Sequence, residues 1–280
     1  MGLRIATNIS SLTSQRHLQT TRKLLDKSLE RLASGYRINR AGDDAAGLAI
    51  SEKLRAKTQG LIQAQRNASD GVSLIQVAEG GLQEVQNILV RLRELGVQAA
   101  SDTIGQRERR YLNEEYQSLK EELDRIANST EYDGTILLDG TAGSMDFQIN
   151  TGGRNLLGVD RISFNAFKLD VNTDKLGLSE IGIADKITSQ RSLGIIDSAI
   201  EEVSSVRGEL GALENRLSST VGNIGISVEN LSAARSRIKD VDIANETAEM
   251  TKHSILMQAG IAVLAQANNV PKMALQLLQP

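Results

Sequence analysis

Few residues in this 280-residue chain have the type and spacing that catalysis or metal binding requires. The sequence has no cysteine, which excludes disulfides, thiolate metal sites and cysteine nucleophiles. Its two histidines, His17 and His253, lie near opposite ends of the chain in segments of helical periodicity. Neither has a nucleophile at a recognisable spacing, so both are interpreted as helix-face residues. We predict no catalytic residue, no metal site and no cofactor.

Residues 42–47, GDDAAG, are the best candidate for a binding loop because they contain adjacent carboxylates. The stretch lacks the further ligand spacing of a calcium loop. Helical periodicity follows directly, which favours a helix start with Asp43 and Asp44 at its positive end. The phosphate-binding motifs GxGxxG and GxxxxGK[ST] do not occur in the sequence. An enzyme is therefore not predicted.

The composition favours long helices packed on helices. Aromatic residues make up 2% of the chain, and both prolines, Pro271 and Pro280, lie near the C-terminus. The apolar surface is thus supplied mainly by Leu, Ile, Val and Ala, which suit helical packing. No stretch has the length and hydrophobicity of a membrane span, and the N-terminus lacks the apolar segment of a cleavable signal peptide. We expect no membrane insertion, and export only by another route.

Charge is distributed unevenly along the chain. Residues 1–66 carry twelve Lys/Arg and five Asp/Glu, whereas the whole chain has a net charge of −3. A basic N-terminal segment is one feature of nucleic-acid-binding proteins. Tyr36 is the only aromatic residue of that segment on which a base could stack. We favour the alternative, in which these charges meet complementary charges in the same assembly, and predict no nucleic-acid partner.

Hydrophobic periodicity predicts five helices. Their ranges are 8–33, with a stop at Ser34-Gly35, 44–101, 106–129, with a stop at Asp133-Gly134, 189–238 and 243–278. Pro271 is expected to bend or weaken the last helix. Between the third and fourth helices, alternating apolar residues predict strands around 145–149 and 167–171, with a turn at Gly152-Gly153. The expected fold is mainly α: a long antiparallel helical bundle or coiled coil from both chain ends, with a small central β-hairpin region.

Each end of the chain has an apolar seam at seven-residue spacing. The N-terminal seam consists of Leu18, Leu25 and Leu32, and the C-terminal seam of Leu256, Val263, Val270 and Leu277. Gly260, Ala267 and Ala274 run beside the second seam, and such small residues permit close helix approach. The central β-region offers these seams no evident partner. Their natural partners are each other or further copies of the chain.

Three stretches closely resemble bacterial flagellins. Residues 28–51, SLERLASGYRINRAGDDAAGLAIS, resemble the N-terminal signature of that family. Residues 236–278, SRIKDVDIANETAEMTKHSILMQAGIAVLAQANNVPKMALQLL, resemble its C-terminal signature. Residues 90–101, VRLRELGVQAAS, are similar to the helix that innate receptors sense. The resemblance identifies the chain as a filament subunit, in a minimal form without large outer domains.

The resemblance implies which part of the filament subunit each segment of the chain forms. Residues 1–34 and 240–280 would be the terminal helices of the inner filament core, joined by a linking spoke at 35–47. Residues 48–135 and 186–239 would form a helical rod domain, with 136–185 as its small β-region. The residues expected to pack in the filament core are those of the two seams: Leu18, Leu25, Leu32, Leu256, Val263, Val270 and Leu277.

The resemblance also implies partners and a location. The chain would polymerise with many copies of itself, in the extracellular flagellum, after secretion without a cleaved signal peptide. Other partners would be a flagellar export chaperone, the type III export apparatus, and hook-junction and cap proteins. A host Toll-like receptor would contact Arg91, Leu95 and Glu115, although Val90 replaces the polar residue usual before this arginine. The alternative is a hook–filament junction protein, which has flagellin-like termini.

Overall fold

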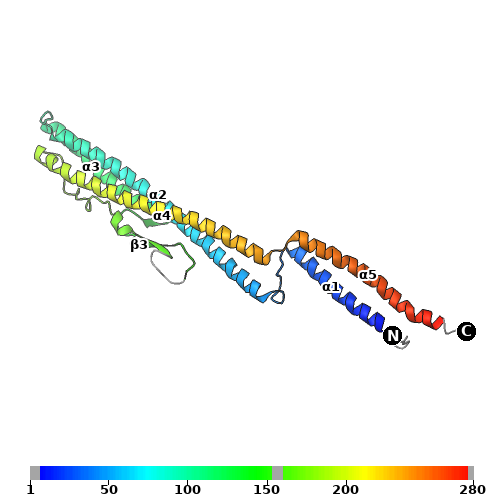
Figure 1. Ribbon diagram of the computed structural model, residues 1–280. Helices are drawn as coiled ribbons and strands as arrows, with labels where there is room; N and C mark the ends of the chain where they lie inside the picture. Colours follow the sequence, from blue (N-terminus) through cyan, green and yellow to red (C-terminus); the bar gives the residue numbers. More distant parts are fainter. Residues whose placement is uncertain (1–6, 153–159, 277–280) are drawn as a thin grey trace. The chain divides into compact units, whose positions relative to one another are not determined.

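The computed structural model describes residues 7–152 and 160–276, with side chains described up to Val270 (Figure 1). The elements in chain order are α1 (Ile9–Ser34), α2 (Ala45–Ala100), α3 (Gln106–Ser129), β1 (Glu131–Tyr132), β2 (Thr135–Ile136), β3 (Ser144–Gln148), β4 (Arg161–Asn165), η1 (Ala166–Leu169), α4 (Lys186–Lys239) and α5 (Ile243–Gln276). The expected class, mainly α with a small β-hairpin region, is confirmed. The chain forms two compact units. The terminal unit comprises Met1–Ala56 and Asn230–Pro280, and the central unit comprises Lys57–Glu229.

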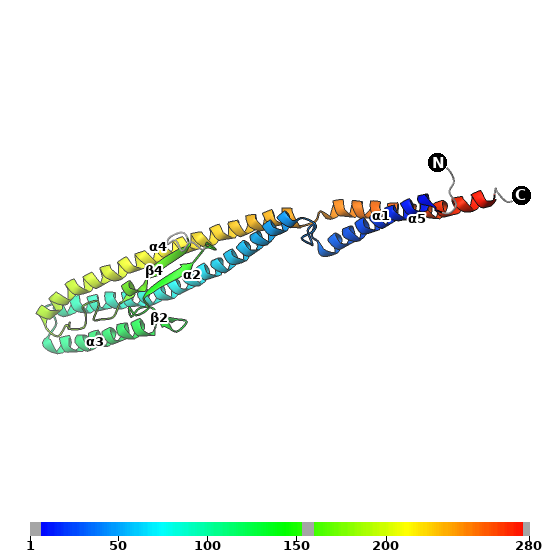
Figure 2. The same ribbon diagram turned by 90° about the horizontal axis from the view of Figure 1, so that it is seen from below.

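In the terminal unit, α1 and α5 lie side by side and run in opposite directions (Figures 1 and 2). The Asn8 side chain begins α1 by accepting a hydrogen bond from the Ser11 N–H. The helix ends where predicted, at Gly35, whose φ of 73° is left-handed and whose N–H donates to the Arg31 carbonyl. The Asp242 carboxylate begins α5, and this helix continues to Gln276. Pro271 therefore does not terminate it.

In the central unit, α3 and the adjoining parts of α2 and α4 enclose a single apolar core. Leucines of α2 supply much of it, and Leu82, Leu89, Leu92 and Leu95 are fully buried.

Polar side chains of α3 hold in place the irregular segment between η1 and α4. Lys120 Nζ donates to the Ser179 and Ile181 carbonyls, and Asp124 accepts hydrogen bonds from the N–H and hydroxyl of Thr173. A segment without regular structure is thereby held on the core.

The β-structure of the central unit consists of two hairpins, β1–β2 and β3–β4. Asp133 and Gly134, with φ of 50° and 75°, form the turn between β1 and β2. The helix α3 ends at Ser129, as predicted, and the predicted polar turn at Asp133-Gly134 is the turn of this hairpin, not the helix stop itself. Strands β3 and β4 pair antiparallel, with Met145 opposite Phe164. This second hairpin lies against α2 and α4 (Figure 2), and Phe147 approaches Gly71.

The strand predicted around residues 167–171 was wrong. That stretch begins with the 3-10 helix η1, because the Asn165 side chain accepts a hydrogen bond from the Phe167 N–H and turns the backbone. Leu169 and Val171 are buried, whereas Phe167 is exposed, so the three alternating apolar residues do not share one buried face. The second strand of the hairpin is β4, a few residues earlier. The predicted turn at Gly152-Gly153 falls partly outside the described residues.

Candidate functional site

The contact between α1 and α5 is made of small and polar residues together with one leucine stripe. Leu18 of α1 lies against Gly260 of α5, where an added Cβ would stand 3.0 Å from Leu18 Cδ2. Ala267 is buried, and so are Ser11 and Ser28 of α1. Small side chains allow two helix axes to approach closely. The seven-residue run of small residues beside the Leu/Val seam was the sequence signal for this contact.

Polar groups set the register of the pair at both ends. At one end, Asn8 Nδ2 donates to the Ala267 carbonyl at 2.8 Å, and Ser11 Oγ donates to Asn268 Oδ1 at 2.7 Å. At the other end, Arg31 Nη1 lies 3.3 Å from Glu246 Oε2. A slip by one helical turn would break all three contacts. The antiparallel register of the chain ends is therefore specific.

The two predicted seams are placed differently within a single chain. Leu18, Leu25 and Leu32 of α1 are all partly buried on one stripe, and Leu18 meets α5. In α5, by contrast, Leu256, Val263 and Val270 are 49%, 58% and 41% exposed. Val263 is three residues beyond Gly260, about 60° around the helix, so the Leu/Val stripe is turned to one flank of the pair. The fourth seam residue, Leu277, lies outside the described residues.

A groove of about 550 Å³ runs between α1 and α5 on the pair. Its apolar lining is Leu12, Leu18, Met257, Ile261 and Leu264, and its polar lining is Gln15, Arg16, Gln19 and Arg22. Leu12 and Ile261 are each 57% exposed. Leu256, Val263 and Val270 are not among the lining residues. The pair thus has two separate apolar surfaces, the Leu/Val stripe and this groove.

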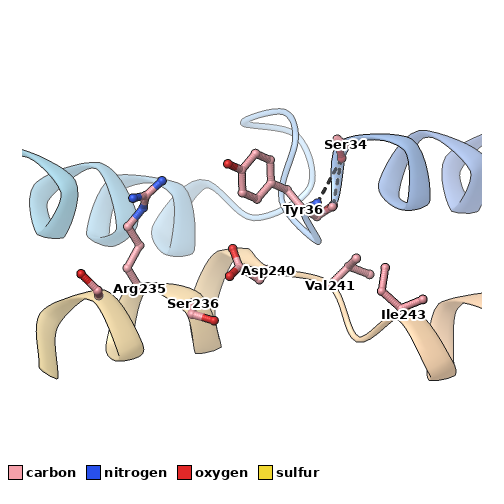
Figure 3. Close-up of a pocket in the computed structure, with 9 residues that line it drawn as sticks. Ser34, Tyr36, Arg235, Ser236, Asp240, Val241 and Ile243 are labelled. Atoms are coloured by element: carbon pink, nitrogen blue, oxygen red, sulfur yellow. Dashed lines mark hydrogen bonds between the residues drawn. The ribbon is translucent and has the colours of Figure 1, made fainter. Parts of the chain in front are cut away.

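The two connections of the terminal unit, residues 35–44 and 240–242, lie next to each other (Figure 3). Backbone hydrogen bonds hold them together. Arg37 N–H donates to the Lys239 carbonyl at 2.7 Å, and Val241 N–H donates to the Gly35 carbonyl at 3.0 Å. Tyr36 and Asp240 face each other in the resulting antiparallel bridge. The ammonium of Lys239 lies 5.2 Å from the centre of the Tyr36 ring. The start of α5 is in this way tied to the end of α1.

Asp43 and Asp44 both stabilise the turn that leads into α2. Lys27 Nζ lies 2.7 Å from Asp43 Oδ1, and the N–H groups of Asn39 and Arg40 donate to Asp43 Oδ2. The ammonium of Lys27, followed by these N–H groups, lowers the pKa of Asp43 to about 2. Asp44 Oδ1 accepts a hydrogen bond from the Gly47 N–H at 2.8 Å. The interpretation of residues 42–47 as a helix start is confirmed.

A polar groove of about 520 Å³ lies beside the Tyr36–Asp240 bridge (Figure 3). Its lining is Ser34, Gly35, Tyr36, Ser232, Arg235, Ser236, Asp240, Val241 and Ile243. The Ser34 hydroxyl is engaged locally, because it accepts a hydrogen bond from the Tyr36 N–H at 3.1 Å.

His253, on α5, has its Nε2 atom 3.5 Å from Glu249 of the same helix. Within the described ranges, no cluster of His, Asp and Glu could hold a metal ion.

The three residues expected at a receptor contact separate into two environments. Arg91 of α2 and Glu115 of α3 are both about half exposed and form an ion pair of 2.7 Å, which raises the pKa of Arg91. Leu95 is fully buried in the core of the central unit. The folded helices do not present its side chain, and a receptor contact that involves Leu95 stays a prediction. The spacing of the apolar residues in α2 places Leu95 on the face of the helix that packs into the core.

Among the described helices, none is long and apolar enough to cross a membrane.

The chain ends pair in a fixed register, and the pair keeps two exposed apolar surfaces. This is the construction of a self-assembling structural subunit. Comparison with known proteins identifies the class more closely. Residues 5–143 match the bacterial flagellin N-terminal helical region, and residues 193–278 match the bacterial flagellin C-terminal helical region.

Several relatives match the chain over almost its whole length. A flagellin of Halalkalibacterium halodurans is 44% identical over 97% of this chain and 98% of the relative. A Bacillus subtilis flagellin is 42% identical over 99% of this chain and 100% of the relative. The crystal structure of Bacillus cereus flagellin is similar with a TM-score of 0.50 and 29% identity, covering 61% of this chain and 94% of that one. The chain belongs to the bacterial flagellin family.

The family relationship establishes the general function. The chain is a structural protein, not an enzyme, and it self-polymerises into the filament of the bacterial flagellum, which is extracellular. A putative flagellar hook-associated protein from Vibrio parahaemolyticus is also similar, with a TM-score of 0.57, but at 14% identity it shows the shared fold alone. The junction-protein alternative is therefore not better supported than the filament subunit.

Proposed function

We propose that the α1–α5 pair is the part of the subunit that packs at the core of the filament, as residues 1–34 and 240–280. In this proposal, residues 35–47 form the linking spoke. Residues 48–135 and 186–239 form the helical rod domain, and residues 136–185 form its β-region. The observation that carries the proposal is the exposed Leu/Val stripe of α5, which α1 leaves uncovered. A stripe of this kind on a polymerising subunit is expected to be covered by another copy.

The two seams then have different roles. Leu18, Leu25 and Leu32 hold α1 on α5 within one chain. Leu256, Val263 and Val270 are buried only when copies meet, and Leu277 continues their spacing in the sequence. Complete burial of a Leu or Val side chain contributes about 1.5–3 kcal/mol, so each half-exposed member of the stripe would add about 1 kcal/mol on assembly. The same contact recurs at every subunit, which makes the filament sensitive to small changes in it.

The test is the double substitution Leu256→Asp and Val263→Asp. Two carboxylates in the stripe should prevent polymerisation after salting-out, because they would have to be desolvated without partners. Circular dichroism should still show a folded central unit. A matched control is Thr251→Asp with Gln258→Asp, which places two carboxylates at the same seven-residue spacing on exposed positions of α5. The control should polymerise, and normal filaments from the Leu256/Val263 variant would disprove the role of the stripe.

We also propose that the exposed stripe is covered before assembly by a flagellar export chaperone. Export would then proceed through the type III apparatus, without a cleaved signal peptide, and the finished filament would meet hook-junction and cap proteins. The support is the exposure of Leu256 and Val263, since a bare apolar stripe promotes premature association. Calorimetric titration with the cognate chaperone should give a much weaker Kd for the Leu256→Asp/Val263→Asp variant than for the Thr251→Asp/Gln258→Asp control.

Recognition by a host Toll-like receptor is proposed at the Arg91–Glu115 pair only. Both side chains are exposed and lie together across α2 and α3, which makes them available to a protein partner. Leu95 is left out of this proposal because of its burial.

A further inference from the structure

The groove between α1 and α5 has two chemically different sides. The α1 side supplies all the polar side chains of the described lining, which are Gln15, Arg16, Gln19 and Arg22. The α5 side of the described lining is apolar and consists of Met257, Ile261 and Leu264. Ile261 is 57% exposed in the single chain. The groove therefore presents positive charge and apolar surface to the same ligand.

The two arginines of the groove are available to a ligand. Arg16 and Arg22 are exposed, and neither forms an ion pair within the described part of the chain. Lys27 and Arg31 of the same helix, by contrast, each form one. None of the described lining residues is acidic. Guanidinium groups bind carboxylates and phosphates through parallel N–H donors, so the groove favours an anion.

The register of the helix pair orders the lining along the groove. Leu18 lies against Gly260, and the helices run antiparallel. Arg22 therefore lies at the Met257 end of the groove. Leu12 lies at the opposite end, about 15 Å away along α1. One end of the groove is thus charged, and an apolar path leads from it to a leucine at the other end.

From these observations, we propose that the groove binds a free single-chain anionic amphiphile, such as a fatty acid. Arg16 and Arg22 hold the carboxylate, and the acyl chain lies along Met257 and Ile261 towards Leu12. The length is suitable, because an acyl chain that spans half of a hydrocarbon core of about 30 Å is about 15 Å long. The volume of about 550 Å³ also lies within the range of ligand pockets, about 300–1,000 Å³. The site is separate from the Leu/Val stripe, so the proposal does not depend on the role of that stripe in assembly.

Calorimetric titration of the depolymerised full-length chain with laurate, below the concentration at which laurate forms micelles, tests the proposal. We expect saturable binding of one molecule per chain. Decanoate should bind more weakly, by about fourfold for each CH₂ group removed, because less apolar surface leaves water. Dodecyltrimethylammonium, which has the same chain length and the opposite charge, should bind at least tenfold more weakly than laurate. Absence of saturable laurate binding, or equal binding of the cationic amphiphile, would overturn the proposal.

The double substitution Arg16→Gln and Arg22→Gln should weaken laurate binding at least tenfold, because hydrogen bonds to charged groups are lost. The matched control is Lys23→Gln with Lys53→Gln, which removes the same charge at exposed positions outside the groove lining. The control should bind laurate as the wild type does. Equal weakening in both variants would show attraction by the general charge of the chain and would reject the groove.

Methyl NMR of the wild-type chain locates the ligand without any substitution. Met257 lines the groove, whereas Met145 and Met250 do not. Laurate should shift the Met257 methyl resonance and leave the other two in place, and laurate binding without a shift of Met257 would place the site elsewhere. Phosphatidylglycerol vesicles distinguish a free amphiphile from a membrane surface. Binding of the chain to these vesicles without binding of free laurate would overturn the proposal.

Discussion

Gly260 of α5 and Leu18 of α1 are so close that a Cβ at Gly260 would lie 3.0 Å from Leu18 Cδ2 and 3.1 Å from Leu18 Cγ. The absence of a side chain at this position lets the leucine rest on the α5 backbone. The exposed stripe and the groove keep their places relative to each other because the two helices are held in this register. The contact is thus a requirement for the proposed assembly surface as well as for the pair.

Gly260→Leu is expected to separate the helices and lower the melting temperature of assembled filaments. Overpacking of a close contact costs about 1–3 kcal/mol, which equals or exceeds the gain of about 1 kcal/mol from replacing glycine in a helix. Circular dichroism of filaments during heating measures the change. Gly208→Leu in α4 is the control, because no atom lies within 4 Å of its added Cβ. Filaments of Gly260→Leu that melt at or above the wild-type temperature would contradict the expectation.

The turn held by Asp43 should loosen only in strong acid. Its pKa is lowered from 3.8 to about 2 by Lys27 and by the N–H groups of Arg40 and Asn39. A lowered folded-state pKa stabilises the fold above the unfolded value of 3.8, and this contribution is lost as the pH falls from 3.8 through about 2. The amide resonances of Asn39 and Arg40, followed by NMR, should therefore titrate near pH 2.

Asp43→Asn is the matched variant for this titration. The amide oxygen still accepts the two backbone hydrogen bonds, but the neutral side chain does not titrate or pair with the Lys27 ammonium. The acid transition of the Asn39 and Arg40 amides should disappear in this variant. A wild-type midpoint near 3.8 would instead show that Lys27 does not hold Asp43 in solution.

Tyr116 is expected to make the central unit sensitive to alkali. Its ring is fully buried, its hydroxyl has no hydrogen-bond partner within the described residues, and desolvation raises its pKa to about 12. Below pH 10.0 the phenol is protonated in both the folded and unfolded states. As the pH rises from 10.0 towards 12, only the unfolded state ionises, so the free energy of unfolding should fall. Urea unfolding at several pH values measures this decrease.

Tyr116→Phe should show a smaller alkaline decrease than the wild type. At neutral pH the same variant should be equally stable, or more stable by about 1 kcal/mol, because it removes an unpartnered buried hydroxyl. Tyr111→Phe is the control, since Tyr111 is 58% exposed. Marked destabilisation of Tyr116→Phe at neutral pH would show that the hydroxyl is hydrogen-bonded in solution.

The proposed receptor recognition at the Arg91–Glu115 pair should depend on the charge of these two side chains. Arg91→Glu should reduce the response of a Toll-like receptor reporter to depolymerised protein by at least tenfold, because a charge reversal at an interface is strongly unfavourable. Arg93→Glu is the control on the same helix, because Arg93 is equally exposed and also ion-paired. No response to the wild-type protein, or equal responses to both variants, would remove this proposal.

Much of the fold could be predicted because helices follow from local pattern. The bounds of α3 and the end of α1 at Gly35 agree with periodicity and with a glycine stop. The hairpins were less predictable. Phe167, Leu169 and Val171 alternate like a strand, yet a side-chain hydrogen bond from the Phe167 N–H to Asn165 formed η1 instead. Such competition between local hydrogen bonds is not visible in the alternation of apolar residues.

The sequence by itself determined that this is a helical, cysteine-free flagellin with an apolar seam at each end. Those features are local: heptad spacing, composition and long family signatures need no knowledge of which residues meet. Only the tertiary structure decided that Gly260 and Ala267 face α1, that Leu256 and Val263 remain exposed, and that Leu95 is buried. A helix presents several faces with similar periodicity, and the face that is buried depends on how closely a distant segment can approach it. On α5 the face with the smallest side chains packs against α1, and the Leu/Val stripe is therefore left uncovered.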